Sequence, residues 1–198
     1  MFGLYITHPQ VKIDPAVPVP KWGLNDVGRA RAEAVAAKPW VREIRRIISS
    51  DETKAIELAG ILADVAGVDV EIVEGAHEND RSATGFLPPP EFEKAADWFF
   101  AHPTESFHGW ERAADAQARI VSVVNTILAG HDLTQPIAFV GHGGVGTLLR
   151  CHLAGLPIAR DKDQPPNGGG NVHAFRLRDL APLSGWVPME DFSTPAIG

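Results

Sequence analysis

The chain of 198 residues has little of several features that define particular classes of protein. Its single cysteine, Cys151, cannot form an internal disulfide, so nothing points to an oxidising compartment. No apolar run approaches the roughly 18 residues that cross a bilayer. The short apolar start, residues 1–6, lacks the basic flank and cleavage site of a signal peptide. We therefore expect a cytoplasmic protein that has no membrane partner.

Positive charge is also scarce. Lys and Arg number 18 against 25 Asp and Glu, which gives a formal net charge of -7. Affinity for nucleic acid requires clustered cations, so we expect no nucleic-acid partner. A small phosphorylated substrate remains compatible, because a local cationic pocket can exist on an acidic protein.

Three catalytic signatures are missing from the sequence. The spacings His-x-His and His-Glu-x-x-His of metal hydrolases do not occur. The Gly-x-Ser-x-Gly turn of serine hydrolases is absent, and Gly141-His142-Gly143-Gly144 has histidine where that serine would stand. The phosphate-binding loop Gly-x-x-x-x-Gly-Lys-Ser/Thr is absent as well, which argues against an NTPase.

What is present is an ordinary globular composition, with 44% hydrophobic and 22% charged residues. Apolar periodicity predicts helices and strands in alternation along the chain. The predicted strands are 2–7, 45–49, 68–73, 136–140, 171–177 and a short one at 186–189; the predicted helices follow Asn25 or Asp26, follow Ser50 or Asp51, and cover 91–101, 111–129 and 144–154. This alternation predicts one domain over residues 1–198, built as an α/β fold: a three-layer α/β/α sandwich with a mainly parallel central sheet.

Residues 79–110 differ in composition from the rest of the chain. They contain Gly85, the run Pro88-Pro89-Pro90 and seven Phe or Trp residues. We expect a lid-like insertion with one helix, lying over the site. Its aromatic residues could form an apolar wall for a substrate, a core beneath the lid, or a dimer face, and the sequence leaves the oligomeric state open.

Two predicted strands end directly in histidine, at His8 and at His142. Ligands of such sheets bind beyond the carboxyl ends of the strands, so both imidazoles should project at one edge. Gly143 and the next glycine let the backbone approach a ligand, and the helix they open favours an anion. One histidine could be a nucleophile while the other donates to the developing charge. A histidine at a strand end can equally be a polar boundary residue, and His173 is a possible rim residue.

Five motifs, in order, resemble those of the histidine phosphatase (phosphoglycerate mutase-like) superfamily, and together they cover residues 2–177. The opening strand and Thr7-His8-Pro9 stand where the family reads Arg-His-Gly. The other four are Gly23-Leu24-Asn25-Asp26-Val27-Gly28, Ser49-Ser50 followed by Lys54-Ala55, the segment 76–81 around Glu78, and Val140-Gly141-His142-Gly143-Gly144.

The resemblance implies a role for each of three residues. His8 would be the nucleophile that becomes phosphohistidine, and His142 would stabilise the transferring group. Glu78 would protonate the leaving alkoxide and then activate water, with no metal and no cofactor. Alternatively, Glu78 is an ordinary surface acid beside Arg81.

The chain departs from the family where phosphate is bound. Thr7 replaces the arginine before the nucleophile, and Lys54 replaces the second phosphate-binding arginine. Arginine grips two phosphate oxygens at once, whereas lysine is a point charge and threonine carries no charge. Arg81 is a candidate to refill the site, or else a surface partner of Asp80. The predicted phosphate-binding residues are Thr7, Lys54, Arg81 and Gly143.

The sequence thus predicts a metal-independent phosphomonoester phosphatase of the histidine acid phosphatase type, acting on a small phosphorylated substrate. The replaced arginines put activity in question, because loss of one charge-stabilising group commonly slows an enzyme by about two to three orders of magnitude. Two alternatives stay open: an impaired relative that binds a phosphorylated ligand, and a phosphoglycerate mutase-like phosphotransferase.

Overall fold

A six-stranded sheet forms the centre of residues 1–195, which the computed structural model describes. The strands are β1 (Phe2–Thr7), β2 (Arg46–Ser50), β3 (Val70–Val73), β4 (Ile137–Gly141), β5 (Asn171–Arg176) and β6 (Val187–Pro188), in the order β3-β2-β4-β1-β5-β6. The first four strands pair in parallel, whereas β5 pairs antiparallel with both β1 and β6. The prediction of a mainly parallel sheet is confirmed.

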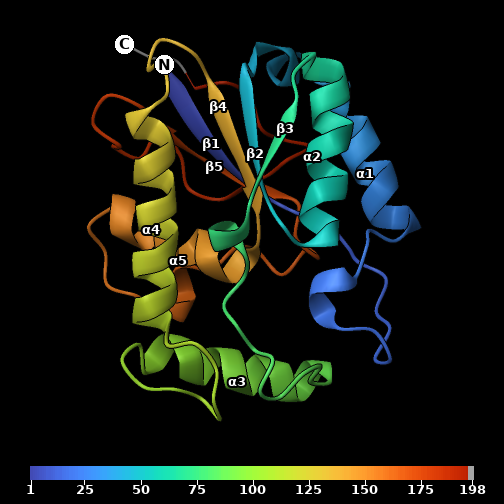
Figure 1. The fold of residues 1–198 in the computed structure, drawn as a ribbon, viewed down its shortest axis with the longest axis vertical. Helices are drawn as coiled ribbons and strands as arrows, with labels where there is room; N and C mark the ends of the chain where they lie inside the picture. Colours follow the sequence, from blue (N-terminus) through green and yellow to red (C-terminus); the bar gives the residue numbers. More distant parts are fainter. Residues whose placement is uncertain (196–198) are drawn as a thin grey trace.

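Helices cover both faces of the sheet, as Figure 1 shows. On one face lie α1 (Asp26–Ala36) and α2 (Thr53–Ala66), and on the other lie α4 (Ala113–Ala129) and α5 (Gly143–Leu153). Side chains alternate along β1: Leu4 and Ile6 join the buried cluster of α1 and α2, while Tyr5 joins that of α4 and α5. The predicted three-layer sandwich is therefore confirmed.

The parallel pairing of β1 and β4 sets the two strand ends side by side. In this register Thr7 lies opposite Gly141, and the N–H of His8 donates to the Gly141 carbonyl at 3.0 Å. His8 and His142, each the next residue along, consequently emerge at the same edge of the sheet, as the sequence predicts.

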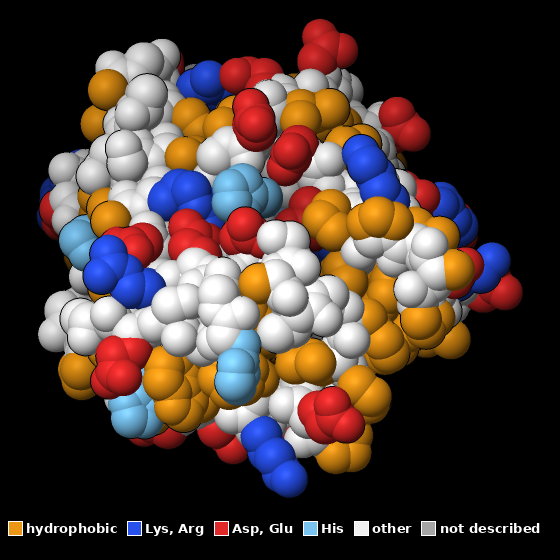
Figure 2. Space-filling model, turned by 60° about the horizontal axis from the view of Figure 1, so that its bottom comes forward, with side chains coloured by type: hydrophobic (Ala, Val, Ile, Leu, Met, Phe, Trp, Pro, Cys, Tyr) orange, Lys and Arg blue, Asp and Glu red, His pale blue; other side chains and the backbone are white. Residues whose placement is uncertain are grey.

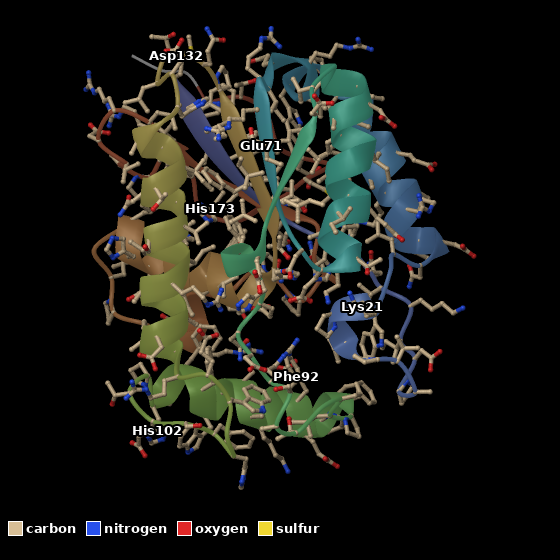
Figure 3. All side chains as sticks on the ribbon, in the orientation of Figure 1. Lys21, Glu71, Phe92, His102, Asp132 and His173 are labelled. Carbon is tan, nitrogen blue, oxygen red and sulfur yellow. The ribbon has the colours of Figure 1, made fainter. Side chains whose placement is uncertain are left out.

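One helix lies beyond that edge. Helix α3 (Pro89–Ala101) crosses the carboxyl end of the parallel strands (Figure 1). Figure 3 places Phe92 on the side of α3 that faces the sheet. Phe99, Phe100 and Trp110 are buried, so part of the aromatic content of 79–110 is core. No described helix is long and apolar enough to cross a membrane.

Local details correct two predictions. The Asn25 side chain caps α1 as expected, accepting from the Gly28 N–H at 2.8 Å. For α2, however, the residue at the capping position is Glu52, not Ser50 or Asp51, and its carboxylate turns into the site and makes no capping bond. His173 is wrongly predicted as a rim residue: it is 2% exposed and stacks on Tyr5 inside the molecule.

Candidate active site

The imidazole rings of His8 and His142 lie next to each other, with centroids 5.3 Å apart and planes at 68°. Nδ1 of His8 is 2.8 Å from the carbonyl oxygen of Pro9. Because a carbonyl can only accept, Nδ1 carries the hydrogen and Nε2 keeps its lone pair. Burial, assisted by His142, lowers the pKa of His8 to about 3, so the ring is neutral at physiological pH. The structure thus presents a neutral imidazole whose Nε2 has a free lone pair.

The glycine loop before β5 lies against the backbone of His8. The N–H of Gly170 donates to the His8 carbonyl at 3.0 Å. A Cβ on Gly169, whose φ is +79°, would stand 2.2 Å from the same oxygen. Only glycine fits there, because the position combines a left-handed backbone with a close approach. The loop therefore helps to position His8.

The ring of His142 is fully buried, and its two nitrogens differ. Nε2 lies 2.7 Å from Ser50 Oγ and 3.6 Å from a carboxylate oxygen of Glu52. Nδ1 is buried without a hydrogen-bond partner among the described residues. Buried polar atoms are nearly always paired in proteins, so an unpartnered nitrogen beside the His8 ring is available to a ligand. Burial lowers the pKa of His142.

Glu78 occupies the amino end of α5, where the sequence predicts a bound anion. Its carboxylate accepts from the N–H groups of Gly144 at 3.0 Å and Val145 at 2.9 Å. Burial tends to raise the pKa of Glu78, but the neighbouring His142 and Arg81 and the N–H donors outweigh it and hold the pKa below its usual value. The anion of this helix is thus the protein's own carboxylate.

Lys54 is held in a buried ion pair. Its ammonium group donates to the Glu52 carboxylate and, at 2.9 Å, to the Val19 carbonyl, and its side chain is 4% exposed. Burial acts to raise the pKa of Glu52, yet His142 and Lys54 lower it to about 2. Glu52 also accepts from the N–H of Glu78 at 3.0 Å. The charge of Lys54 is therefore neutralised, and its contact with the site passes through Glu52.

The side chain of Thr7, the residue before His8, is bonded within the protein. Its hydroxyl donates to Oε1 of Gln164 at 2.8 Å and accepts from the N–H of Asn171 at 2.9 Å, and the residue is fully buried. Both capacities of the hydroxyl are thus satisfied by the protein, and the structure does not bring it to the group around His8.

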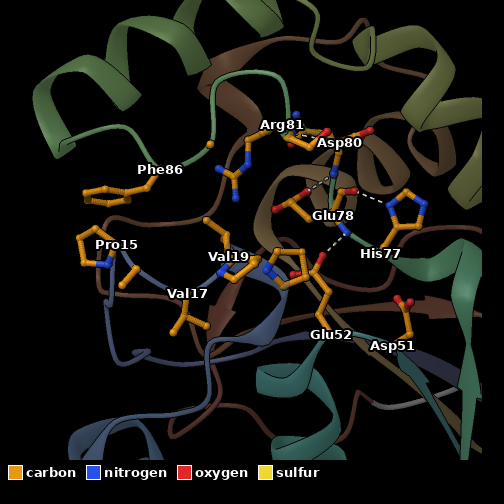
Figure 4. A pocket seen from close by; sticks show the side chains of 16 residues that line it. Pro15, Val17, Val19, Asp51, Glu52, His77, Glu78, Asp80, Arg81 and Phe86 are labelled. Carbon is orange, nitrogen blue, oxygen red and sulfur yellow. Dashed lines mark hydrogen bonds between the residues drawn. The ribbon is translucent and has the colours of Figure 1, made fainter.

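Two cavities meet at Glu78, Asn79 and Arg81, which line both. The smaller, of about 420 Å³, also has His8, Gly143 and Gln164 in its wall, together with aromatic residues of α3. The larger, of about 620 Å³, has an apolar wall formed by 15–20 and Phe86, opposite Asp51, Glu52 and Asp80. Figure 4 shows Arg81 extending into the larger cavity. On the surface, acidic, basic and histidine side chains gather in the middle of this face, with hydrophobic side chains beside them (Figure 2).

Arg81 makes no ion pair within residues 1–195. Its guanidinium carbon lies 4.9 Å from the ring centroid of Phe92 and 5.9 Å from that of Trp110. The Asp80 carboxylate accepts instead from the N–H of Ser82 at 2.8 Å. The alternative of a surface pair with Asp80 is therefore not what the structure shows, and a charged group remains at the junction of the cavities.

Arg119 on α4 fixes the segment that carries Glu78. Its guanidinium donates to the carbonyls of Gly75, His77 and Glu78 at 2.8, 2.9 and 3.2 Å, and it pairs with Glu111 at 2.7 Å. Sequence reasoning missed Arg119, as it missed Glu52, Asn79 and Gln164. Glu52 could have been noticed as an acid between two motif residues, Ser50 and Lys54; the other three carry no local signal.

Within residues 1–195, no group of three or more His, Cys, Asp or Glu side chains is arranged to hold a metal ion. That the chemistry needs neither metal nor cofactor stays a prediction.

Two neighbouring histidines lie at the carboxyl edge of a mixed α/β sheet, with the half-buried carboxylate of Glu78 near them. Sequence comparison identifies the class of protein to which this site belongs. Residues 17–176 match the histidine phosphatase superfamily (branch 1), and the chain belongs to this family.

Particular relatives can also be named. The chain is 29% identical over 167 residues to glucosyl-3-phosphoglycerate phosphatase of Mycolicibacterium vanbaalenii, covering 78% of this chain and 72% of the relative. It is 27% identical over 184 residues to the protein of that name from Mycobacterium tuberculosis, covering 86% of this chain and 78% of the relative. Among solved structures, Bacillus stearothermophilus YhfR superposes with a TM-score of 0.78 at 20% identity, over 97% and 98% of the two chains. The last likeness concerns the fold alone.

Proposed function

We propose that this protein is a phosphomonoester phosphatase that works through a phosphohistidine on His8. The observation that carries the proposal is the bond from Nδ1 of His8 to the Pro9 carbonyl, which leaves Nε2 of a neutral ring free for attack. The family of the chain and the phosphatase names of its two mycobacterial relatives support the same reaction.

The reaction takes two displacements. In the first, Nε2 of His8 attacks phosphorus, the bond to the ester oxygen breaks, and Glu78 in its protonated form gives that oxygen a proton. In the second, the Glu78 carboxylate takes a proton from water, the resulting hydroxide attacks phosphorus, and the phosphorus–nitrogen bond breaks. Inorganic phosphate leaves, and His8 and Glu78 return to their starting states.

Stabilisation of the transferring group comes from the donors around the smaller cavity. Nδ1 of His142 is unpartnered among the described residues, and Ser50 at Nε2 allows the tautomer with hydrogen on Nδ1. The guanidinium of Arg81 supplies positive charge, and the N–H of Gly143, which bonds to nothing in residues 1–195, is a third donor. Lys54 contributes indirectly, by holding Glu52 against the backbone of Glu78.

The larger cavity receives the leaving alcohol, because Glu78, the proton donor, lines both cavities. Segment 79–110 acts as the lid of this single domain, and its Phe86 faces the apolar wall at Pro15 (Figure 4). Asp51 and Asp80, on the opposite side of this cavity, favour an uncharged or cationic leaving group over an anionic one.

A second candidate function is binding of a phosphorylated ligand without turnover. The observation in its favour is the neutralised Lys54. Arg160, which lines the smaller cavity, is likewise paired with Asp163, so Arg81 is the cation at the cavities that has no ion pair within residues 1–195.

Hydrolysis of para-nitrophenyl phosphate with chelator present tests the proposal, with His8→Ala compared to the wild type. His152→Ala, on the exposed surface of α5, is the matched control. Turnover that survives chelator, vanishes in His8→Ala and persists in the control supports the proposal. Absence of turnover together with calorimetric binding of inorganic phosphate would favour the binding protein.

A further inference from the structure

The carboxamide of Gln164 is oriented by the protein and leaves its donor side free. Its Oε1 accepts from the Thr7 hydroxyl at 2.8 Å and from Nδ2 of Asn171 at 2.9 Å. The Asn171 NH₂ sets which end of the amide is which, because a reversed amide would place its NH₂ against that group, whereas the Thr7 hydroxyl can pair with either end. Nε2 consequently points away from Thr7, and it donates to no acceptor within residues 1–195.

That free donor lies against the start of α5. A Cβ built on Gly143 would stand 2.2 Å from Nε2 of Gln164, so the amide contacts the residue that follows His142. Gln164 and Gly143 share the wall of the smaller cavity with His8 and Glu78. The amide therefore reaches the space in which a phosphoryl group must sit for His8 to attack it.

The amino end of α5 cannot supply all the donors that this group needs. Glu78 already takes the N–H groups of Gly144 and Val145. Lys54 is committed to Glu52 and Val19. Besides His142, Arg81 and the N–H of Gly143, a side chain on another element can add a donor, and Gln164 is free to provide one.

We infer that Gln164 is a catalytic residue whose Nε2 binds an oxygen of the transferring phosphoryl group, and that Thr7 is a positioning residue acting through it. The inference rests on the proposed function. It also assigns a task to Thr7, whose hydroxyl reaches the site through the Gln164 carboxamide. The group bound is a tetrahedral oxyanion. Gln164 would bind it through a neutral N–H donor, which adds no positive charge to the site.

The variant Gln164→Met keeps the length of the side chain and removes the donor. We expect kcat/KM for para-nitrophenyl phosphate to fall by about 10²-fold, the usual loss for one donor to a transition-state oxyanion. Gln164→Glu should lose more, because its carboxylate would face the phosphoryl oxygens. Gln135→Met, on an exposed turn, is the matched control and should retain full activity.

Coupling between the two residues tests the positioning role. Thr7→Val should lower kcat/KM in the wild type but have no further effect on Gln164→Met, whereas Thr7→Ser should retain activity. Thermal unfolding of each variant separates a folding defect from a catalytic one. Unchanged kcat/KM in a folded Gln164→Met would overturn the inference, and additive losses would overturn the role of Thr7. Failure of the proposed function looks different, since either the wild type would show no turnover or activity would survive His8→Ala.

Discussion

The backbone N–H of Gly144 lies 3.0 Å from a carboxylate oxygen of Glu78. The positive end of α5 is therefore occupied by a side chain of the protein, and Glu78 is an anion before any substrate arrives. Two consequences follow. The proposed proton donor must first acquire its proton, and the phosphoryl group must be bound chiefly by donors other than the amides of Gly144 and Val145.

The pH dependence of kcat/KM should follow the proton on Glu78. Its pKa is lowered, so the protonated fraction, and with it kcat/KM for an alkyl phosphate, should increase as the pH falls below neutrality. His8 does not oppose this increase, because its pKa of about 3 keeps the nucleophile neutral through the acidic range. A rate that instead falls below pH 6.5, the ordinary pKa of histidine, would contradict this assignment.

Comparison of Glu78→Gln with the wild type separates the effect of the Glu78 proton on kcat/KM from ionisation of the substrate, because the substrate ionises identically in both assays. The variant should lower kcat/KM by about 10²- to 10⁴-fold for an alkyl phosphate and less for para-nitrophenyl phosphate, whose leaving group needs less protonation. Equal losses on the two esters would mean that Glu78 is not the acid.

Removal of Arg81 should weaken catalysis more than folding. Arg81→Met removes the unpaired cation that lines both cavities, and we expect kcat/KM to fall by about 10²- to 10³-fold. The free energy of unfolding should change by about 1 kcal/mol, through the lost contacts with Phe92 and Trp110. Arg112→Met, on the surface, is the control; similar kinetics for both variants would exclude a role for Arg81.

The buried pair of Glu52 and Lys54 should behave as a unit in urea unfolding. Lys54→Met leaves the Glu52 charge buried without its partner and should cost about 3–5 kcal/mol of unfolding free energy. Adding Glu52→Gln to that variant removes the uncompensated charge and should recover most of the loss. If the two changes are simply additive, the pair is not coupled as its geometry indicates.

His173 should make the stability depend on pH. Burial, with a smaller effect of Arg150, lowers its pKa from 6.5 to about 3. Its stabilising neutral form is fully effective above pH 6.5, and this contribution is lost as the pH falls towards 3, by up to about 1.4 kcal/mol per pH unit. His173→Phe keeps the ring against Tyr5, and its Nε2 has no partner to lose within the described chain. The variant should show a flatter dependence; an unchanged slope would refute the assignment.

The sequence was sufficient for the layers of the fold and for the neighbouring histidines. Alternation of apolar residues identifies β1 and β4, and parallel pairing then places His8 and His142 at one edge. The occupant of the α5 amino end could not be predicted, because Glu78 reaches Gly144 across 66 positions of sequence. Helix signals show that the amides are available but do not show which anion takes them.

The side-chain partners of Lys54 and Thr7 also escaped prediction. The motif suggests that both side chains face phosphate. In the structure the Lys54 ammonium pairs with Glu52, and the Thr7 hydroxyl bonds to Gln164, which is 157 positions away. The pairing of Thr7 with Gln164 depends on how a loop folds back, which local propensity does not encode. Glu52, by contrast, lies only two positions from Lys54 and could have been noticed. The segment before β5 carries Gln164 and fixes the backbone of His8, and no local pattern in the sequence predicts either role.

The most direct test of the proposed mechanism is to trap the phosphoenzyme. Wild-type protein and His8→Ala would be mixed with para-nitrophenyl phosphate, quenched in alkali within the first turnover, and mapped by mass spectrometry. We predict a phosphoryl group on His8 in the wild type and none in His8→Ala. Turnover by the wild type with no phosphorylated histidine at any quench time, or undiminished turnover by His8→Ala, would contradict it.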